Sequence, residues 1–384
     1  MSYTKESLNK LYRTLAQEID ISDEMFNLAE KEYNDLGTWI DEKTPTYKIS
    51  IYPQGSFALG TVVRPISGKD DYDLDLVCSF EQSYGLSAKE LKCDIVKPLL
   101  VGYKSSTSGI IEKRRCWHVD YDDIPNFHMD VVPAYKAWDR IKITEHDEQV
   151  DDYRYIGSNP AGYAEWFLGR CAYQHKRLLN AYISEHNRAV AQADIEVLKR
   201  QKVKTPLQRA VQILKRHRDI SCSEVAAKDR PISIIITTIA GQLYEEQDDI
   251  VGALDAILSG AEKYIYDHMR DGNYYIMNPS YEGENFANKW NEPKTKHRAD
   301  VFIHWLRQAR DELVSDKVYE MDRIGMGSHI AKAFGVSTQV KVFKQMAEAE
   351  KEGILSGTIK VDSARGTLST SGTIQVPPNH HYGL

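Results

Sequence analysis

Two aspartates, Asp73 and Asp75, stand two positions apart in the segment Tyr-Asp-Leu-Asp-Leu-Val, whose alternation predicts a β-strand. Residues two apart on a strand share a face, so the two carboxylates point the same way. Neighbouring carboxylates repel each other unless a cation lies between them, and oxygen ligands suit Mg²⁺ or Mn²⁺. The pair therefore predicts a divalent-metal site, with a solvated acidic strand end as the alternative.

Residues 109–121 and 127–132 are further predicted strands, and the second, Phe-His-Met-Asp-Val-Val, contains a third carboxylate, Asp130. A carboxylate inside such an apolar strand needs a partner, either in the core or through a shared metal. Three aspartates around two metal ions can activate an attacking hydroxyl and stabilise a leaving phosphate. We therefore expect Asp73, Asp75 and Asp130 to be catalytic metal ligands, and His128 to be a hydrogen-bonded structural residue.

A Gly-Ser turn, Gln54-Gly55-Ser56-Phe57, lies between a predicted strand at 47–52 and a short helical stretch. Glycine lets the backbone approach a phosphate closely, the start of a helix offers free N–H groups, and Ser56 adds a hydroxyl donor. Such a turn is usually structural when it occurs alone. Because it precedes the aspartate pair, we expect it to bind phosphate.

Helical patterns surround the predicted strands. Apolar spacing predicts helices over residues 5–20, after Ser22 (with Ser22 or Asp23 as the cap) and over 160–190. Thr205-Pro206-Leu207-Gln208 is a capping box that opens a largely helical region. We expect an α+β protein with four parts: N-terminal helices (1–45), a mixed-sheet core (46–200), a helical lobe (201–350) and a flexible tail (351–384).

Composition narrows the function classes. No run of about 18 apolar residues exists and the N-terminus is polar, so we expect no membrane span, no signal peptide and a cytoplasmic location. The five cysteines form no CxxC pair, which favours reduced thiols over a zinc site. The net charge of −7 favours small anionic ligands over long nucleic acid.

The order Gly55-Ser56, Asp73-x-Asp75, Asp130 resembles that of the polymerase-β-like nucleotidyltransferases. Together with Gln54, Phe57 and later motifs, it resembles the bacterial CD-NTases of CBASS antiphage defence, which are related to cyclic GMP-AMP synthase and DncV. The resemblance covers roughly residues 10–345. It implies the polymerase-β-like fold, two Mg²⁺ ions (Mn²⁺ can substitute) held by the three aspartates, and nucleotide contacts from Gln54, Gly55 and Ser56.

Later motifs extend the resemblance into the predicted helical lobe. Lys215, one turn beyond Val211, matches the lysine that meets the donor triphosphate, and a lysine suits phosphate as a point charge. Ser233, at the start of the next apolar helix, matches a serine that also meets the nucleotide. Asn285 matches a residue near the base pocket, where an amide can read a base edge. Each of the three also has a structural alternative, as a solvated lysine, a helix cap or a capped loop.

The expected function is therefore the joining of NTPs, ATP among them, into a cyclic di- or trinucleotide containing adenine, with release of pyrophosphate, for antiphage signalling. The resemblance implies an effector activated by that product and an E1/E2-like partner that conjugates the C-terminal tail. Three alternatives remain: a template-independent transferase acting on RNA ends, a catalytically silent binding module, and a transferase that modifies a protein. We expect no direct binding of nucleic acid and no membrane contact.

Overall fold

The computed structural model describes residues 3–66, 72–104, 109–121, 124, 127–186, 203–363 and 367–376. The chain folds into two compact units. One spans Ile19–Val314, and the other combines Met1–Glu18 with Ser315–Leu384. All of the predicted site residues belong to the unit Ile19–Val314.

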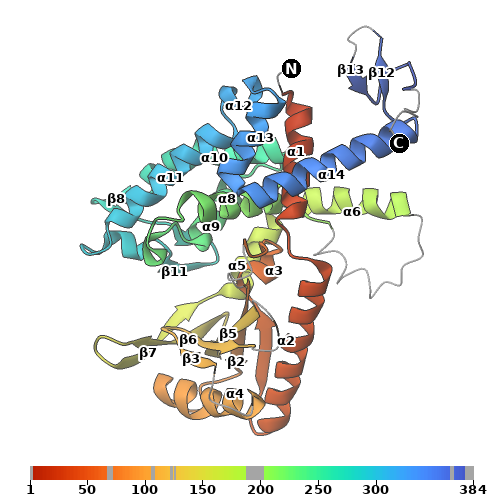
Figure 1. Ribbon diagram of the computed structural model, residues 1–384. Coiled ribbons are helices and arrows are strands. Elements are labelled where there is room, and N and C mark those ends of the chain that lie inside the picture. Colours follow the sequence, from red (N-terminus) through yellow and green to blue (C-terminus); the bar gives the residue numbers. More distant parts are fainter. Residues whose placement is uncertain are drawn as a thin grey trace. The chain divides into compact units, whose positions relative to one another are not determined.

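A mixed seven-stranded sheet makes up one part of the unit Ile19–Val314, and helices make up most of the rest (Figure 1). Its strand order is β1-β2-β5-β4-β3, with β6 paired to β5 and β7. Within it β2 and β5 run parallel, and the other described pairings are antiparallel. The strands are β1 (Ile49–Pro53), β2 (Tyr72–Phe80), β3 (Ile110–Glu112), β4 (Trp117–Asp120), β5 (Phe127–Ala137), β6 (Arg140–Asp147) and β7 (Asp152–Ser158).

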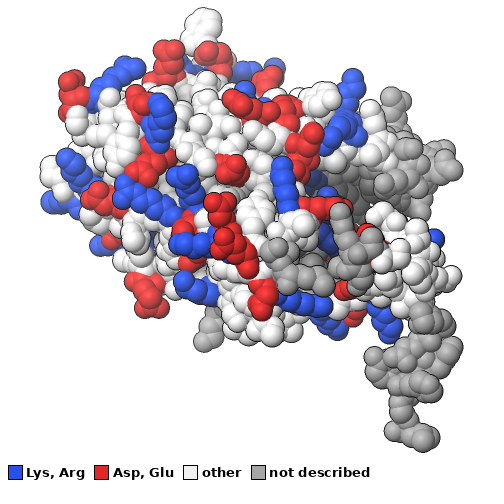
Figure 2. Space-filling model, turned by 90° about the horizontal axis from the view of Figure 1, so that it is seen from above, with Lys and Arg blue, Asp and Glu red and all other residues white. Residues whose placement is uncertain are grey.

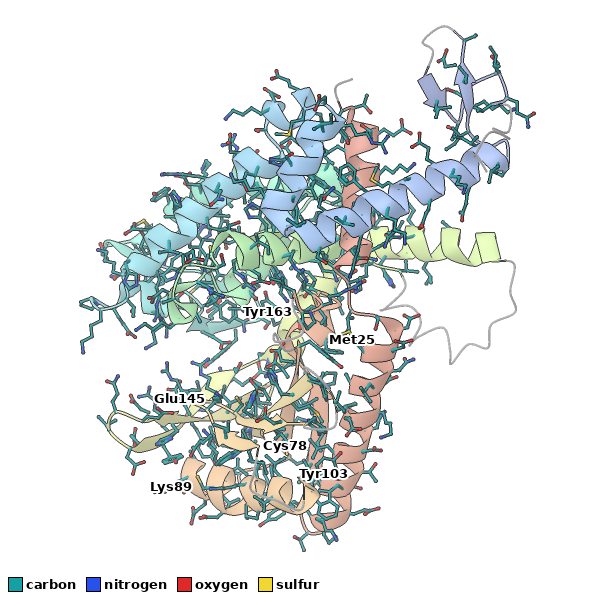
Figure 3. All side chains as sticks on the ribbon, viewed as in Figure 1. Met25, Cys78, Lys89, Tyr103, Glu145 and Tyr163 are labelled. Carbon is teal, nitrogen blue, oxygen red and sulfur yellow. The ribbon has the colours of Figure 1, made fainter. Side chains whose placement is uncertain are left out.

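Alternation in β4 and in the first residues of β2 and β5 gives this part of the sheet one apolar and one polar face. Leu74, Val119 and Met129 are at most 3% exposed and belong to one hydrophobic cluster. Helices α2 (Asp23–Lys43) and α4 (Lys97–Lys104) pack on that side, and Figure 3 labels Tyr103 of α4 and Cys78 of β2 there. The polar side chains of the same strands consequently point to the opposite face.

The rest of this unit is mostly helical. Helix α8 packs against α9, α10 and α11. Between α10 and α11 lie the short strands β8 (Met269–Arg270), β9 (Asn273–Tyr274), β10 (Met277–Asn278) and β11 (Tyr281–Asn285) and the 3-10 helix η3 (Asn288–Asn291). Apart from α2 and α4, the described helices of this unit are α3 (Gly55–Leu59), η1 (Glu90–Val96), α5 (Pro160–Gly169), α6 (Ala172–His186), α8 (Pro206–Ser221), η2 (Ala227–Asp229), α9 (Ser233–Leu243), α10 (Ile250–Asp267) and α11 (His297–Leu313), together with η3.

The second unit joins the two ends of the chain. Helix α1 (Lys5–Glu18) packs along α14 (Val336–Leu355), and Gln345 Nε2 donates to Glu18 Oε2 over 2.9 Å. The unit also holds α12 (Asp316–Glu320), α13 (Arg323–Phe334), β12 (Lys360–Asp362) and β13 (Thr367–Ser369). Across the described residues, no helix is both long and apolar enough to cross a membrane.

The predicted fold class is confirmed, and so is the capping box at Thr205. The helices expected over 5–20 and after Ser22 are α1, which ends at Glu18, and α2, which begins at Asp23. Several elements were not predicted. The hairpin β6–β7 and the helices η1 and α4 were missed, the segment 109–121 divides into two strands, and 160–190 contains two helices instead of one. The segment read as a flexible tail begins with the end of α14 and includes the pair β12–β13. Its last residues, 377–384, lie outside the described part of the chain.

Candidate active site

Three neighbouring strands align six ionisable side chains on the polar face of the sheet; we call them the acidic floor. In one row of the register, Asp75 of β2 pairs with Asp130 of β5, which pairs with His118 of β4. In the adjacent row, Asp73 pairs with His128, which pairs with Asp120. The three predicted aspartates are therefore brought together by strand pairing.

The acidic floor carries an unfavourable concentration of negative charge. Burial, together with the carboxylates of Asp73 and Asp130, raises the pKa of Asp75 well above its ordinary value. The positive charge of Lys215 acts in the opposite direction. Such a donor set fits divalent cations with oxygen ligands, because a cation would remove the repulsion that raises the pKa of Asp75.

His118 connects two of the carboxylates and was not predicted as a site residue. Its Nδ1 lies 2.9 Å from Asp130 Oδ1, and its Nε2 lies 3.0 Å from Asp120 Oδ1. Its ring centroid is 4.2 Å from that of His128, and ligand atoms of His118, His128 and Asp130 all lie within 4.8 Å of one another. The alternation Trp-His-Val-Asp in the predicted strand was the signal that could have placed His118 beside Asp130.

The Gly-Ser turn approaches the acidic floor closely at Gly55. Gln54 N donates to Asp75 O over 2.8 Å, which places the turn beside the strand that carries Asp73 and Asp75. Gly55 has φ +59°, and a Cβ at this position would overlap Asp75 Oδ2 and lie 3.2 Å from its Cγ. Glycine is thus needed here both for its backbone conformation and for the absence of a side chain.

Helix α8 is anchored to the segment that follows this turn. Thr205 and Gln208 form the capping box that fixes the start of the helix. Along one face, Gln208 Nε2 donates to Leu59 O over 2.9 Å and Lys215 Nζ donates to Thr61 O over 3.1 Å. These two hydrogen bonds, from different turns of α8, fix the helix to residues 59–61 and so hold Lys215 close to the Gly-Ser turn.

The charge of Lys215 is balanced between two sets of neighbours. Burial, and then the charge of Arg218, lowers its pKa to about 8. Asp73, Asp219 and Asp75 favour the protonated form. A triphosphate would add further negative charge and favour the ammonium form at neutral pH. Lys215 is thus suited to an anionic ligand.

These residues line one cavity of about 1000 Å³. It reaches from the acidic floor to α9, β10 and β11, and Figure 3 labels Tyr163 of α5, another of its wall residues. The predicted residues that line the cavity are Gln54, Gly55, Ser56, Asp73, Asp75, Lys215 and Ser233.

Two predicted residues do not line the cavity. Asp130 is not among the residues that line the cavity, although it is paired with Asp75 in the sheet. Asn285 is bonded to backbone groups: its Oδ1 accepts from Ile276 N and Ala287 N, each over 3.0 Å, and its Nδ2 donates to Tyr274 O over 2.9 Å. The structure therefore uses the Asn285 amide to shape the loop, and it does not bring this residue together with the others as a base-reading group.

Several cationic residues of the cavity were not predicted. Arg64, Arg115, Arg218 and Arg230 line it beside Lys215. Arg218 Nη1 donates to Ser233 Oγ and to Pro231 O, each over 2.9 Å, which ties α8 to the start of α9. The sequence did carry a signal for one of them. Arg218 follows Lys215 by three positions, and residues three apart on a helix are neighbours, so both could be expected at the same cavity.

A cavity in which clustered carboxylates face a lysine and several arginines has the chemistry needed to hold a triphosphate and a divalent metal. On a mixed sheet joined to a helical lobe, this arrangement fits the predicted nucleotidyltransferase.

Comparison with known proteins places the chain more closely. Residues 7–170 match the model of the Second Messenger Oligonucleotide or Dinucleotide Synthetase domain, SMODS. The whole chain is 28% identical to a c-di-GMP synthase of Roseivirga ehrenbergii, over 99% of that relative. It is also 24% identical to the cyclic dinucleotide synthase CdnG of Bradyrhizobium diazoefficiens, over 77% of this chain and 72% of that one.

A solved structure shares the fold. The structure of B. diazoefficiens CdnG in complex with GTP superposes with a TM-score of 0.70 at 21% identity, covering 88% of this chain and 99% of that one. The match of residues 7–170 to the SMODS domain and the similarity to these synthases confirm the predicted resemblance to the bacterial CD-NTases, and with it the predicted class of enzyme, a nucleotidyltransferase.

Proposed function

We propose that this protein condenses two molecules of GTP into cyclic di-GMP and releases two molecules of pyrophosphate. The observation that carries the proposal is the meeting of Asp73 and Asp75 with Lys215 in one nucleotide-sized cavity. The choice of GTP is supported by two relatives, one named a c-di-GMP synthase and one solved in complex with GTP.

The reaction consists of two transfers of the same kind. In each transfer a ribose hydroxyl oxygen forms a bond to the α-phosphorus of a nucleotide, and the bond from that phosphorus to pyrophosphate breaks. The hydroxyl proton is lost as the new phosphodiester forms. The first transfer joins two nucleotides and the second closes the ring.

The residues of the chain have separate tasks in this scheme. Asp73, Asp75 and Asp130 would hold two divalent cations, which supply charge stabilisation and increase the acidity of the attacking hydroxyl. Gln54, Gly55 and Ser56 border the space for the triphosphate, and Lys215 presents its positive charge there. Ser233 lines the same space and is oriented by Arg218. His118 orients Asp130 through its hydrogen bond.

The expected use of ATP, and an adenine base in the product, gains no support from these relatives. Their names point to guanine and to dinucleotides. The role in antiphage signalling, the downstream effector and the E1/E2-like partner of the C-terminal tail stay predictions, and the chain end that such a partner would use lies outside the described residues.

The test is product formation from defined nucleotides. Purified protein is incubated with labelled GTP, ATP, CTP and UTP, singly and together, with Mg²⁺ or Mn²⁺. We expect a phosphatase-resistant product from GTP alone that co-migrates with cyclic di-GMP. The variant Asp73→Asn/Asp75→Asn should lose the product by at least about 1000-fold while it keeps its melting transition.

Two other outcomes would redirect the proposal. A cyclic product that requires ATP would overturn the assignment of two guanines. Product that appears only when RNA is supplied would instead indicate the transferase that extends RNA ends. Acidic and basic side chains are interspersed over the described part of the face shown in Figure 2, and the net charge is −7, so these features give the RNA alternative little support.

A further inference from the structure

The cavity has a second wall whose chemistry differs from that of the acidic floor. It is formed by Ser158 at the end of β7, Tyr163 of α5, Asn278 of β10, Glu284 of β11 and Phe286; we call it the lobe wall. Glu284 contributes a carboxylate to this wall, but it makes no ion pair with any described residue. Glu284 therefore lines the cavity without a cationic partner among the described residues, and its role there has to be something other than an ion pair.

The Glu284 carboxylate is held by one buried amide. Asn278 Nδ2 donates to Glu284 Oε2 over 2.8 Å, and Ser158 Oγ approaches the same oxygen at 3.4 Å. Asn278 is only 3% exposed. Its Oδ1 accepts from Ser280 N over 2.9 Å and from Ser280 Oγ over 2.8 Å. These two bonds fix the amide so that its nitrogen faces Glu284.

One oxygen of the Glu284 carboxylate is left available. Both bonds described above end on Oε2, and no donor among the described residues bonds to Oε1. An ionised carboxylate has about four lone-pair sites and accepts hydrogen bonds only. Oε1 can therefore accept one donor of a ligand, and Oε2 can accept an adjacent one, because the 3.4 Å contact from Ser158 is too long to occupy it fully.

The flanks of the lobe wall suit an aromatic base. Tyr163 and Phe286 form an edge-to-face pair with centroids 5.7 Å apart and an interplanar angle of 88°, and Ile234 adds apolar surface nearby. Tyr163 is itself fixed by a hydrogen bond of 2.9 Å between its hydroxyl and Thr238 Oγ1. Bases bind to proteins by contact with such aromatic surfaces together with hydrogen bonds along an edge.

Guanine is the base whose pairing edge matches an acceptor-only group. It presents N1–H and the amino group on C2 as two adjacent donors, whereas adenine and cytosine place a ring-nitrogen acceptor beside their amino group. Uracil has one N–H between two carbonyl acceptors. A bidentate carboxylate thus bonds well to guanine alone, and it repels the ring-nitrogen lone pair of adenine.

We propose that Glu284, oriented by Asn278, reads the pairing edge of guanine and selects GTP over ATP. This inference rests on the proposed function, since it assigns the specificity of the same cavity. It makes Glu284 a substrate-contacting residue that the sequence pattern did not single out, next to Asn285, which shapes the loop.

The experiment compares binding and turnover in Glu284→Gln. Glutamine keeps the size of the side chain and can still accept from Asn278, but it offers a donor to N1 of adenine. We expect kcat/KM for GTP to fall about 10- to 100-fold while use of ATP is kept or rises. Glu282→Gln, an exposed change in the same strand, is the control and should leave the GTP-to-ATP ratio unchanged.

Binding is measured with the α,β-methylene analogues of GTP, ITP and ATP, which cannot release pyrophosphate. Hypoxanthine lacks the amino group on C2, so wild-type protein should bind the ITP analogue several-fold more weakly than the GTP analogue. In Glu284→Gln that difference should shrink to within about twofold, as expected when one member of an interacting pair has been removed.

The two proposals fail in different ways. If no cyclic product forms but the GTP analogue is preferred and Glu284→Gln removes the preference, the reaction is wrong and the guanine contact stands. If cyclic di-GMP forms and Glu284→Gln keeps both its GTP preference and its discrimination against ITP, the assignment of Glu284 is wrong. A fall in melting temperature with unchanged selectivity would also overturn it, by showing that the Asn278–Glu284 bond only joins β10 to β11.

Discussion

The acidic floor and the lobe wall border the same cavity but are built in different ways. On the floor, neighbours in the sheet such as Asp75 and Asp130 are placed by strand alternation and register. On the wall, Ser158 and Glu284 are 126 residues apart in sequence and meet through a side-chain hydrogen bond. The first kind of placement can be read from the local sequence, whereas the second depends on contacts between distant segments.

The two regions also differ in how their charges are compensated. Asp75 has like-charged neighbours, and their repulsion together with burial raises its pKa. Glu284 instead accepts a hydrogen bond from the neutral Asn278. We infer that the floor is arranged for a cation at some cost to the stability of the metal-free protein, while the wall is arranged for a neutral base and carries little such cost.

Among changes that keep every carboxylate of the acidic floor, the largest effect is expected in Gly55→Ala, where the Gly-Ser turn comes closest to Asp75. The new Cβ would overlap Asp75 Oδ2, and φ +59° is unfavourable for alanine. Displacement of a reacting group by about 1 Å can cost about 100-fold in rate, so we expect kcat for cyclic product to fall at least about 100-fold. Steady-state rates of pyrophosphate release measure this change.

Gly37→Ala is the matched control, because a Cβ at Gly37 in helix α2 would meet nothing within 4 Å. Alanine is favoured over glycine inside a helix, so this variant should keep full activity and be slightly more stable. Full activity in Gly55→Ala would show that the backbone at residue 55 can move away from Asp75, and the close packing of turn and strand would then not be needed for catalysis.

A smaller effect is expected at Asn285, beside the lobe wall. Asn285→Ala removes three hydrogen bonds to backbone groups, at Tyr274, Ile276 and Ala287. We expect a loss of about 2 kcal/mol in the free energy of unfolding, measured by thermal or chemical denaturation, with the GTP-to-ATP ratio unchanged. The exposed Asn288→Ala should be nearly neutral. If Asn285→Ala instead changed base selectivity without loss of stability, the amide would be a base contact after all.

The success of sequence-based prediction follows the same division between floor and wall. The strands with Asp73, Asp75 and Asp130 were predictable because alternation fixes which side chains share a face. Lys215 lines the cavity, and its helix could be placed from the sequence because the capping box at Thr205 fixes where that helix begins.

Where alternation and helical period give no guidance, the prediction reached a cavity-lining segment but named a residue that does not line the cavity. Asn285 was chosen and its neighbour Glu284 was not, because the difference between them is set by bonds to Ile276 and Asn278. His118 was missed for a different reason. Its strand was expected, but the pairing of that strand with the strand of Asp130 is a long-range property of the sheet.

The smallest expected effect is a change in the free energy of unfolding, in the variant Asp75→Asn of the acidic floor. Because the pKa of Asp75 is raised in the folded protein, the unfolded chain loses this proton at lower pH than the folded one. The folded state therefore loses stability as the pH rises from the ordinary aspartate value, about 3.9, through the raised pKa of Asp75. The amide has no such titration, so without metal the variant should be more stable than wild type at neutral pH by about 1 kcal/mol, or about 1–3 °C in melting temperature.

Divalent metal should reverse the order of the two proteins. Mg²⁺ or Mn²⁺ should stabilise wild type by mass action and Asp75→Asn much less, because one of the proposed ligands is weakened. Glu284→Gln should show neither the gain without metal nor the altered metal response, since its carboxylate lies on the wall. An Asp75→Asn variant that is less stable than wild type in chelator at pH 7, and equally stable below pH 4, would show that the floor is not under charge repulsion and would remove the main physical reason for placing cations there.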